Sequence, residues 1–98
     1  MYAAIRRYAF DPKDSEEVDQ RIGRDFVPQL RAAGFVAYYW LNQGDGVGAS
    51  ITVFEDEASA ERSVHLAANF AQSHLPMLGI PEVTRGEVKA YSLGTAPG

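Results

Sequence analysis

The chain contains no cysteine, which excludes disulfide bonds, thiolate catalysis and zinc sites built on thiolates. It also has few positive charges, with nine Lys and Arg residues against thirteen Asp and Glu and a formal net charge of −4. Proteins that bind nucleic acid need a clustered positive surface to displace counterions from the phosphates. We therefore expect no DNA or RNA partner, and an RNA-recognition module is excluded as an interpretation.

Long apolar runs are also missing, since none approaches the roughly 20 residues that a membrane-spanning helix needs. Residues 1–10 have neither the long apolar core nor the small-residue cleavage site of a signal peptide. We therefore expect a cytoplasmic protein with no membrane partner. Its 98 residues, 46% of them hydrophobic, are enough for one domain. We place this domain at residues 1–91 and a loose C-terminal tail at residues 92–98.

The pattern of apolar residues predicts six elements in the order βαββαβ. The strands are expected at residues 2–10, 35–41, 47–55 and 83–91, and the helices at residues 15–33 and 57–75. Pro28 predicts a kink or restart near Phe26 in the first helix, and Gly34 ends that helix. With right-handed connections this order gives an α+β ferredoxin-like fold. Its four-stranded antiparallel sheet has the order 4-1-3-2, with both helices on one face.

The two central strand predictions, residues 35–41 and 47–55, are apolar on both faces. Two helices can cover only one face of the sheet, so the other would expose a larger apolar patch than monomers usually do. We therefore predict a homodimer, formed by the helix-free faces of two sheets and arranged as a dimeric α/β barrel. Such an interface would bury on the order of 800 Å² per partner.

Two segments carry a resemblance to a known family: GFVAYY at residues 34–39 and ASITVFEDEASAE at residues 49–61. Over residues 2–91 the chain resembles the dimeric α/β-barrel superfamily, and within it the antibiotic-biosynthesis-monooxygenase-like (ABM-like) proteins. This superfamily includes cofactor-free oxygenases of aromatic polyketides, haem-degrading enzymes and many proteins of unassigned role. The haem-degrading branch implies an Asn, a Trp and a His where this chain has Arg6, Ser63 and His74. Two of the three are missing, so no haem is expected.

Arg6 and Arg7 are unusual because they lie on a strand that is interior in this topology. A buried arginine needs a partner. One interpretation is an ion pair with a carboxylate of a neighbouring strand, such as Glu55 or Glu87. The other is that one arginine points into a pocket between sheet and helix and binds an anionic or enolate oxygen. We assign this second role to Arg6, and we expect Arg7 to act on dimer stability.

His74 shares a flank of the second helix with Phe70 and Ser63, so we predict that His74 and Arg6 are catalytic residues lining one cavity. The aromatic residues expected to bind a small aromatic or phenolic substrate there are Tyr8, Phe54, Phe70 and Trp40. The alternatives are that His74 only stabilises the negative end of its helix, and that the aromatics are core or interface residues. His65 lies on the opposite flank, so the histidines form no metal site and we expect neither metal nor cofactor.

Two functional interpretations follow from the residues and the resemblance. The first is a cofactor-independent monooxygenase, whose aromatic substrate itself supplies the electrons for oxygen activation. The second is a non-catalytic ligand-binding or regulatory dimer on the same scaffold. The sequence favours neither.

Overall fold

The computed structural model describes residues 1–94, apart from the side chain of Ala32. Residues 95–98 of the predicted tail lie outside the described residues. The elements in chain order are β1 (Tyr2–Ala9), the 3-10 turn η1 (Pro12–Asp14), α1 (Ser15–Arg21), the π-helical turn η2 (Ile22–Phe26), α2 (Val27–Leu30), the 3-10 turn η3 (Arg31–Ala33), β2 (Phe35–Gly44), β3 (Val47–Phe54), α3 (Glu57–His74) and β4 (Glu82–Glu87).

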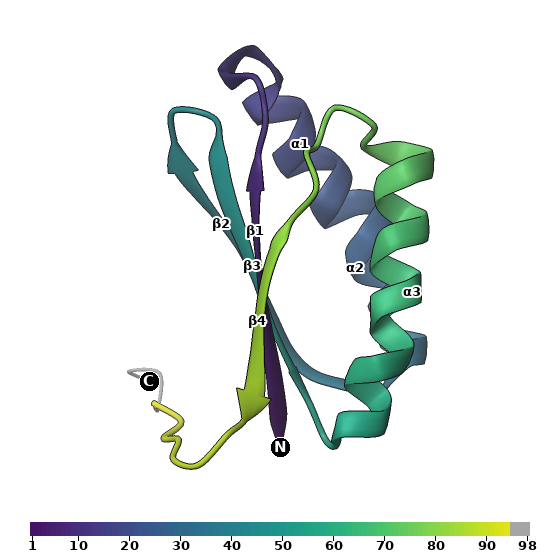
Figure 1. The fold of residues 1–98 in the computed structure, drawn as a ribbon, viewed down its shortest axis with the longest axis vertical. Coiled ribbons are helices and arrows are strands. Elements are labelled where there is room, and N and C mark those ends of the chain that lie inside the picture. The colour runs from purple at the N-terminus through teal and green to yellow at the C-terminus, as the bar shows by residue number, and fades with distance from the viewer. Residues whose placement is uncertain (95–98) are drawn as a thin grey trace.

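The four strands form one sheet in the order β2-β3-β1-β4, and all three neighbouring pairs are antiparallel. This confirms the predicted ferredoxin-like topology. All helices cover the same face of the sheet, and the segment after β4 turns away from them (Figure 1). The other face of the sheet carries no helix. Within residues 1–94, no helix is both long and apolar enough to cross a membrane.

The first helical segment is interrupted where Pro28 predicted it. In η2 the Val27 N–H donates to the carbonyl of Ile22, five residues back, and α2 begins at Val27. The wider turn accommodates a proline that has no N–H for a regular helix. Four apolar residues spaced by four along this segment remain buried together against the sheet: Val18, Ile22, Phe26 and Leu30.

Two local signals in the sequence predict the ends of other elements: Asp56 is a favourable helix N-cap, and Gly44-Asp45-Gly46 favours a tight turn. The Ser59 N–H donates to Asp56 Oδ1 at 2.7 Å, which caps α3. The turn between β2 and β3 places Gly44, Asp45 and Gly46 at positive φ, a conformation that Gly adopts without strain and Asp tolerates.

A β-bulge in β2 decides which of its residues face the helices. Phe35 pairs with Phe54 and Ala37 with Val53, so Val36 is the extra residue. Phe35 and Tyr38 consequently face the same side and pack against the core, although strict alternation would put them on opposite faces. Sequence alternation alone did not predict this.

Helical spacing along residues 57–75 predicts that an apolar stripe faces the sheet, made of Ala60, Val64, Ala67, Ala68, Ala71 and Leu75. The helix α3 is rotated relative to this stripe. That stripe contained small residues such as Val64 and Ala68, which are exposed, while Phe70 is only 5% exposed. Phe70 packs against Phe26 with ring centroids 4.9 Å apart. A phenyl ring buries much more apolar area than an alanine methyl, so its burial decides which side of the helix turns inward. The alanines of the predicted stripe lie beside the contact between Phe70 and Phe26 and take no part in it.

Candidate functional site

A cavity of about 130 Å³ lies between α3 and the strands β1 and β4. We call it the Arg6 cavity, and it is lined by Arg6, Tyr8, Val64, Ala67, Ala68, Ala71, Pro81 and Val83. An apolar cavity of about 150 Å³ in a protein core can bind benzene. The Arg6 cavity therefore has room for about one aromatic ring.

Among residues 1–94, Arg6 is the only charged residue that lines this cavity. It is 6% exposed, and its Nη2 atom is buried without a hydrogen-bond partner. The sheet register places Arg6 opposite Ser50 on β3 and Val83 on β4, and neither carries a carboxylate. A buried cation without a counter-charge costs several kcal/mol. The guanidinium therefore lacks a counter-charge that a bound anion could supply.

The first of the two interpretations, an ion pair between Arg6 and a neighbouring carboxylate, is wrong. Glu55 is exposed at the end of β3, and Glu87 pairs with Lys89 at 3.1 Å. In residues 1–94, no ion pair involves Arg6. Both carboxylates lie beyond the part of β1 where Arg6 sits, because Glu87 is in register with Tyr2.

Arg7 has the opposite environment. It follows Arg6 directly on a strand, so its side chain lies on the other face of the sheet, and it is exposed. Its cross-strand neighbours are Ala49 on β3 and Glu82 on β4. The two arginines are thus divided between the cavity and the helix-free face.

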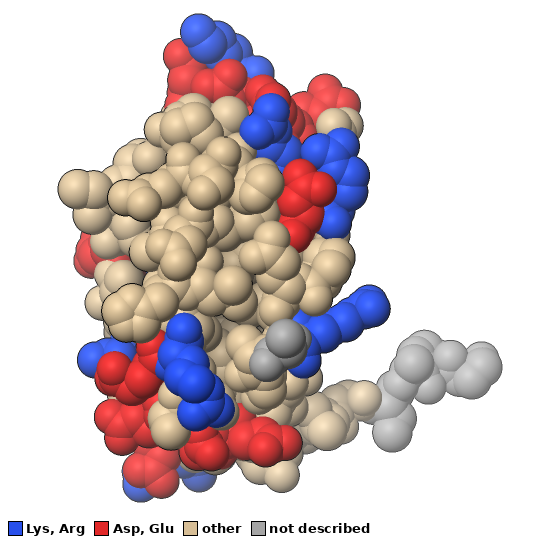
Figure 2. Space-filling model, turned by 90° about the vertical axis from the view of Figure 1, so that its right-hand side faces the viewer, with Lys and Arg blue, Asp and Glu red and all other residues tan. Residues whose placement is uncertain are grey.

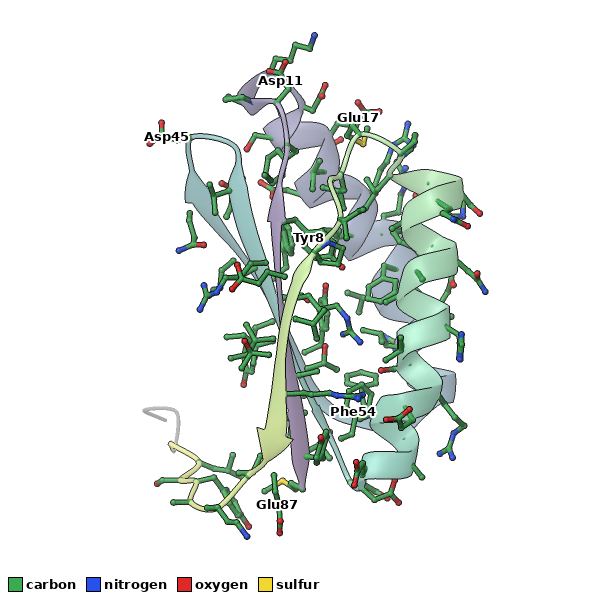
Figure 3. The ribbon with its side chains drawn as sticks, viewed as in Figure 1. Tyr8, Asp11, Glu17, Asp45, Phe54 and Glu87 are labelled. Atoms are coloured by element: carbon green, nitrogen blue, oxygen red, sulfur yellow. The ribbon has the colours of Figure 1, made fainter. Side chains whose placement is uncertain are left out.

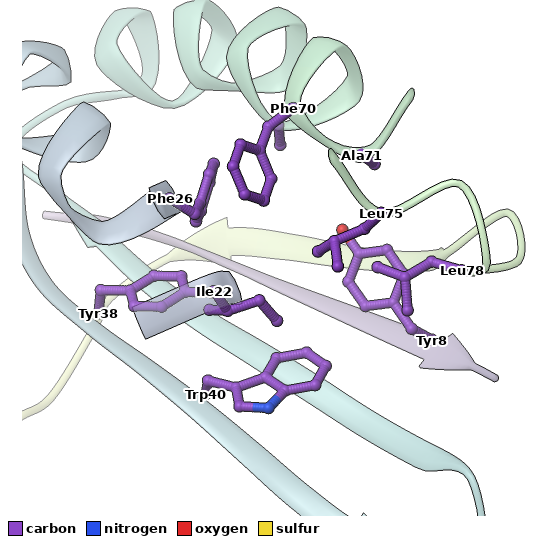
Figure 4. Close-up of a pocket in the computed structure, with 10 residues that line it drawn as sticks. Tyr8, Ile22, Phe26, Tyr38, Trp40, Phe70, Ala71, Leu75 and Leu78 are labelled. Carbon is purple, nitrogen blue, oxygen red and sulfur yellow. The ribbon is translucent and has the colours of Figure 1, made fainter. Parts of the chain in front are cut away.

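Behind Tyr8 lies a second, smaller hollow of about 20 Å³, which we call the aromatic cavity (Figure 4). It has space for about one water molecule. Its lining includes Tyr8, Ile22, Phe26, Tyr38, Trp40, Ala67, Phe70, Ala71, Leu75 and Leu78. Tyr8, Ala67 and Ala71 line both cavities. The Arg6 cavity is consequently backed by tightly packed aromatic side chains.

The two tyrosines near Arg6 are held in their neutral form. Burial raises the pKa of Tyr38, the nearby Tyr8 raises it further, and the Arg6 cation opposes both effects. Burial also raises the pKa of Tyr8 against the same opposing influence of Arg6. A phenol with a raised pKa keeps its proton at neutral pH. These tyrosines can therefore donate hydrogen bonds but do not act as bases.

The predicted substrate-binding residues occupy different positions. Tyr8 lines both cavities, whereas Phe70 and Trp40 line only the aromatic cavity. The position of the Trp40 indole is also fixed by α1, because its Nε1 donates to Asp19 Oδ1 at 2.7 Å. Phe54 lies between the sheet and α3 (Figure 3), but it is fully buried and lines neither cavity.

His74 is exposed at the end of α3 and lines neither cavity. Its ring stacks on Phe70, with centroids 4.8 Å apart, and its backbone carbonyl accepts a hydrogen bond from Arg21 Nη1 at 2.6 Å. The Phe70 ring lies in the core, and the exposed His74 ring stacks on it from the solvent side. The structure therefore does not bring Arg6 and His74 together. An exposed His74, with Arg6 and Ser63 at the other two positions, does not fit a haem.

Sequence reasoning missed the residues that form most of the Arg6 cavity. Val64, Ala67, Ala68 and Ala71 were assigned to a stripe in close contact with the sheet, and Val83 and Pro81 received no role. The signal was present as a run of small residues beside one large aromatic, Phe70. Small side chains next to a bulky packed one leave space against the sheet.

The fold and the cavity define a ferredoxin-like α+β protein with a ring-sized, singly charged cavity between its sheet and α3. No protein-family model matches the sequence, and no curated protein matches it. Solved structures do share the fold, and the following three are representative.

A protein of unknown function from Nitrosomonas europaea, NE2512, is 20% identical with a TM-score of 0.79, covering 97% of this chain and 95% of that one. A dimeric ferredoxin-like protein from an uncultured marine organism is 14% identical with a TM-score of 0.72, covering 93% and 97%. SnoaB, a cofactor-independent oxygenase from Streptomyces nogalater, is 20% identical with a TM-score of 0.65, covering 92% and 94%. The resemblance to ABM-like proteins is thereby confirmed as a likeness of fold.

The raised pKa of Tyr38 predicts a loss of stability at alkaline pH. A tyrosine in the unfolded chain ionises near pH 10, whereas folded Tyr38 holds its proton to higher pH. Its contribution to stability is therefore complete below about pH 10 and is lost as the pH rises further. Urea denaturation should show a lower free energy of unfolding at pH 11 than at pH 8, and a smaller difference for Tyr38→Phe. An identical pH dependence in the variant and the wild type would contradict this assignment.

Proposed function

We propose that this protein is an ABM-like homodimer that binds a small aromatic or phenolic molecule, as its anion, in the Arg6 cavity. The observation that carries the proposal is Arg6, a buried guanidinium that lines a ring-sized cavity and forms no ion pair in residues 1–94. A bound carboxylate, phenolate or enolate would supply the missing counter-charge through a charge-assisted hydrogen bond. The apolar remainder of the lining would contact the ring.

Replacing Arg6 should separate binding from folding. Arg6→Met keeps an unbranched side chain of similar length but removes the charge and the donors. We expect it to weaken benzoate binding by about 1.5 to 3 kcal/mol, the contribution of a hydrogen bond to a charged group, or roughly 10- to 150-fold in Kd. The variant should be at least as stable as the wild type, because an unpaired buried charge is removed. Isothermal titration calorimetry and urea denaturation measure the two effects.

Arg7→Met is the matched control, because it makes the same chemical change on the opposite face of β1. It should leave benzoate affinity unchanged. Benzamide, the neutral isostere of benzoic acid, should bind more weakly than benzoate to the wild type and lose little in Arg6→Met. Equal benzoate affinities for wild type and Arg6→Met would rule out Arg6 as the anion site.

A second candidate function is a cofactor-independent monooxygenase acting in the same cavity. It is supported by the fold shared with SnoaB, which is described as such an oxygenase. A cation beside the bound ring would favour the ionised substrate, whose electrons would then reduce oxygen. Among residues 1–94, however, the lining includes no carboxylate or imidazole to move protons onto the reduced oxygen. This observation favours binding without turnover.

Oxygen uptake separates the two functions. With phenol as the probe, we expect phenolate to appear in the absorption spectrum at a lower pH when bound than when free, because Arg6 stabilises the anion. We expect no oxygen consumption above the uncatalysed rate, since no carboxylate or imidazole among the described lining residues can move protons onto oxygen. Consumption that is lost in Arg6→Met would instead establish the monooxygenase.

The homodimer is supported by the helix-free face of the sheet. Two large apolar residues there are well exposed: Tyr39 by 58% and Leu41 by 47%. Their neighbours on β3, Ile51 and Val53, have the same parity in the strand register and extend the apolar surface. A second copy of the chain would cover this face, and a structural neighbour is described as a dimeric ferredoxin-like protein.

A charge at the centre of this face should prevent dimerisation. Ile51 lies between Ile5 and Tyr39 in the sheet register, so Ile51→Arg would place an unpaired cation in the interface. Size-exclusion chromatography with light scattering at micromolar concentration should give twice the chain mass of 10.7 kDa for the wild type and 10.7 kDa for the variant. His65→Arg, on the exposed side of α3, should remain dimeric. A monomeric wild type would contradict the proposed assembly.

A further inference from the structure

A third hollow opens on the surface next to the Arg6 cavity. It has a volume of about 400 Å³ and lies between the last turns of α3 and the connector formed by residues 76–81. We call it the outer groove. It shares Ala68, Ala71 and Pro81 with the Arg6 cavity, and Ala71 also lines the aromatic cavity. The three hollows therefore adjoin one another at Ala71.

The lining of the outer groove is uncharged. Gln72 supplies the only polar side chain among the described residues of the lining, and the sequence has no Lys, Arg, Asp or Glu between Arg62 and Glu82. Figure 2 shows the α3 side of the molecule, where charged residues gather toward the two ends and one edge and a broad uncharged surface lies between them. Ile80, which lines the groove, is 99% exposed. An apolar occupant would remove this side chain from water.

The groove is held open by the backbone of the connector. The Gly79 N–H donates to the Ala9 carbonyl at 3.0 Å, which attaches the connector to the end of β1. The Leu78 N–H donates to the Leu75 carbonyl at 3.1 Å, which continues the end of α3 into the connector. A ligand would therefore enter a groove whose wall is already attached to the sheet and the helix.

We propose that the ligand is an elongated amphipathic anion. Its aromatic ring, which carries the acidic group, would lie in the Arg6 cavity, and its uncharged apolar chain would pass Ala71 into the outer groove. This inference rests on the proposed function and adds the substrate class. The unpartnered Arg6 Nη2 selects the acidic end. The aromatic cavity, at about 20 Å³, is too small to take the rest of the molecule. The outer groove is the adjoining space that is large enough and apolar.

A series of 4-alkylbenzoates tests the inference on the full-length wild-type protein. Isothermal titration calorimetry with benzoate, 4-methylbenzoate, 4-butylbenzoate and 4-hexylbenzoate should show Kd falling by up to about fourfold for each methylene that the groove buries. Arg6→Met should weaken all four acids by the same factor. An affinity that does not change with chain length, while Arg6 remains necessary, would overturn this inference and leave the proposed function standing. Affinities independent of Arg6 would overturn the proposed function itself.

Two variants locate the alkyl chain. Gln72 is exposed, so Gln72→Glu places a charge in the groove without disturbing the core, and it should reduce the preference for 4-hexylbenzoate over benzoate at least fivefold. Asn69→Glu, also exposed on α3 but outside the lining, is the matched control and should keep the wild-type preference. Ala71→Leu should abolish the preference by narrowing the junction. A wild-type preference in Gln72→Glu would show that the chain binds elsewhere and overturn the inference.

Discussion

The packing of Phe70 against Phe26 is the contact on which the arrangement of this molecule depends. It fixes the rotation of α3 by packing it on η2, and Phe26 in turn packs on Tyr38 of β2 with ring centroids 5.6 Å apart, so aromatic rings set the spacing of α3 from the sheet at that point. The alanines on the neighbouring flank are too small to fill the same spacing, so a hollow remains between α3 and the strands β1 and β4. The cavity is thus a direct consequence of one large residue placed beside several small ones.

The charge in this hollow connects the fold to the proposed function. β1 is an interior strand, so an arginine on its helix-facing side is buried, and the register gives Arg6 neighbours without carboxylates. The folded protein therefore carries a desolvation cost that a bound anion would reduce. The nearby phenols of Tyr8 and Tyr38 remain neutral, so they do not supply the counter-charge. In the same proposal, the uncharged groove beyond Ala71 would contact the apolar chain of the ligand, while Arg6 binds its acidic group.

The elements that local chemistry determines could be predicted from the sequence. Pro28 predicted the interruption of the first helix, Asp56 the start of α3, and the order of elements the sheet topology. The features that depend on competition between side chains could not be predicted in the same way. Helical spacing treats all apolar residues alike, so it did not predict that the large Phe70 ring would decide which side of α3 is buried. Strict strand alternation did not predict the bulge at Val36. His74 was predicted to lie beside Arg6 for the first of these reasons. Topology predicted that β1 is an interior strand, but it did not by itself decide which of Arg6 and Arg7 faces the helices.

A crystal structure of the full chain with 4-hexylbenzoate tests the central claim most directly. The claim is that a ligand completes the buried Arg6 site. The account predicts the carboxylate within hydrogen-bond distance of Arg6 Nη2, the ring in the Arg6 cavity and the alkyl chain along the outer groove past Ala71. A structure in which Arg6 instead pairs with a carboxylate of the protein, or in which the ligand lies on the helix-free face of the sheet, would contradict it.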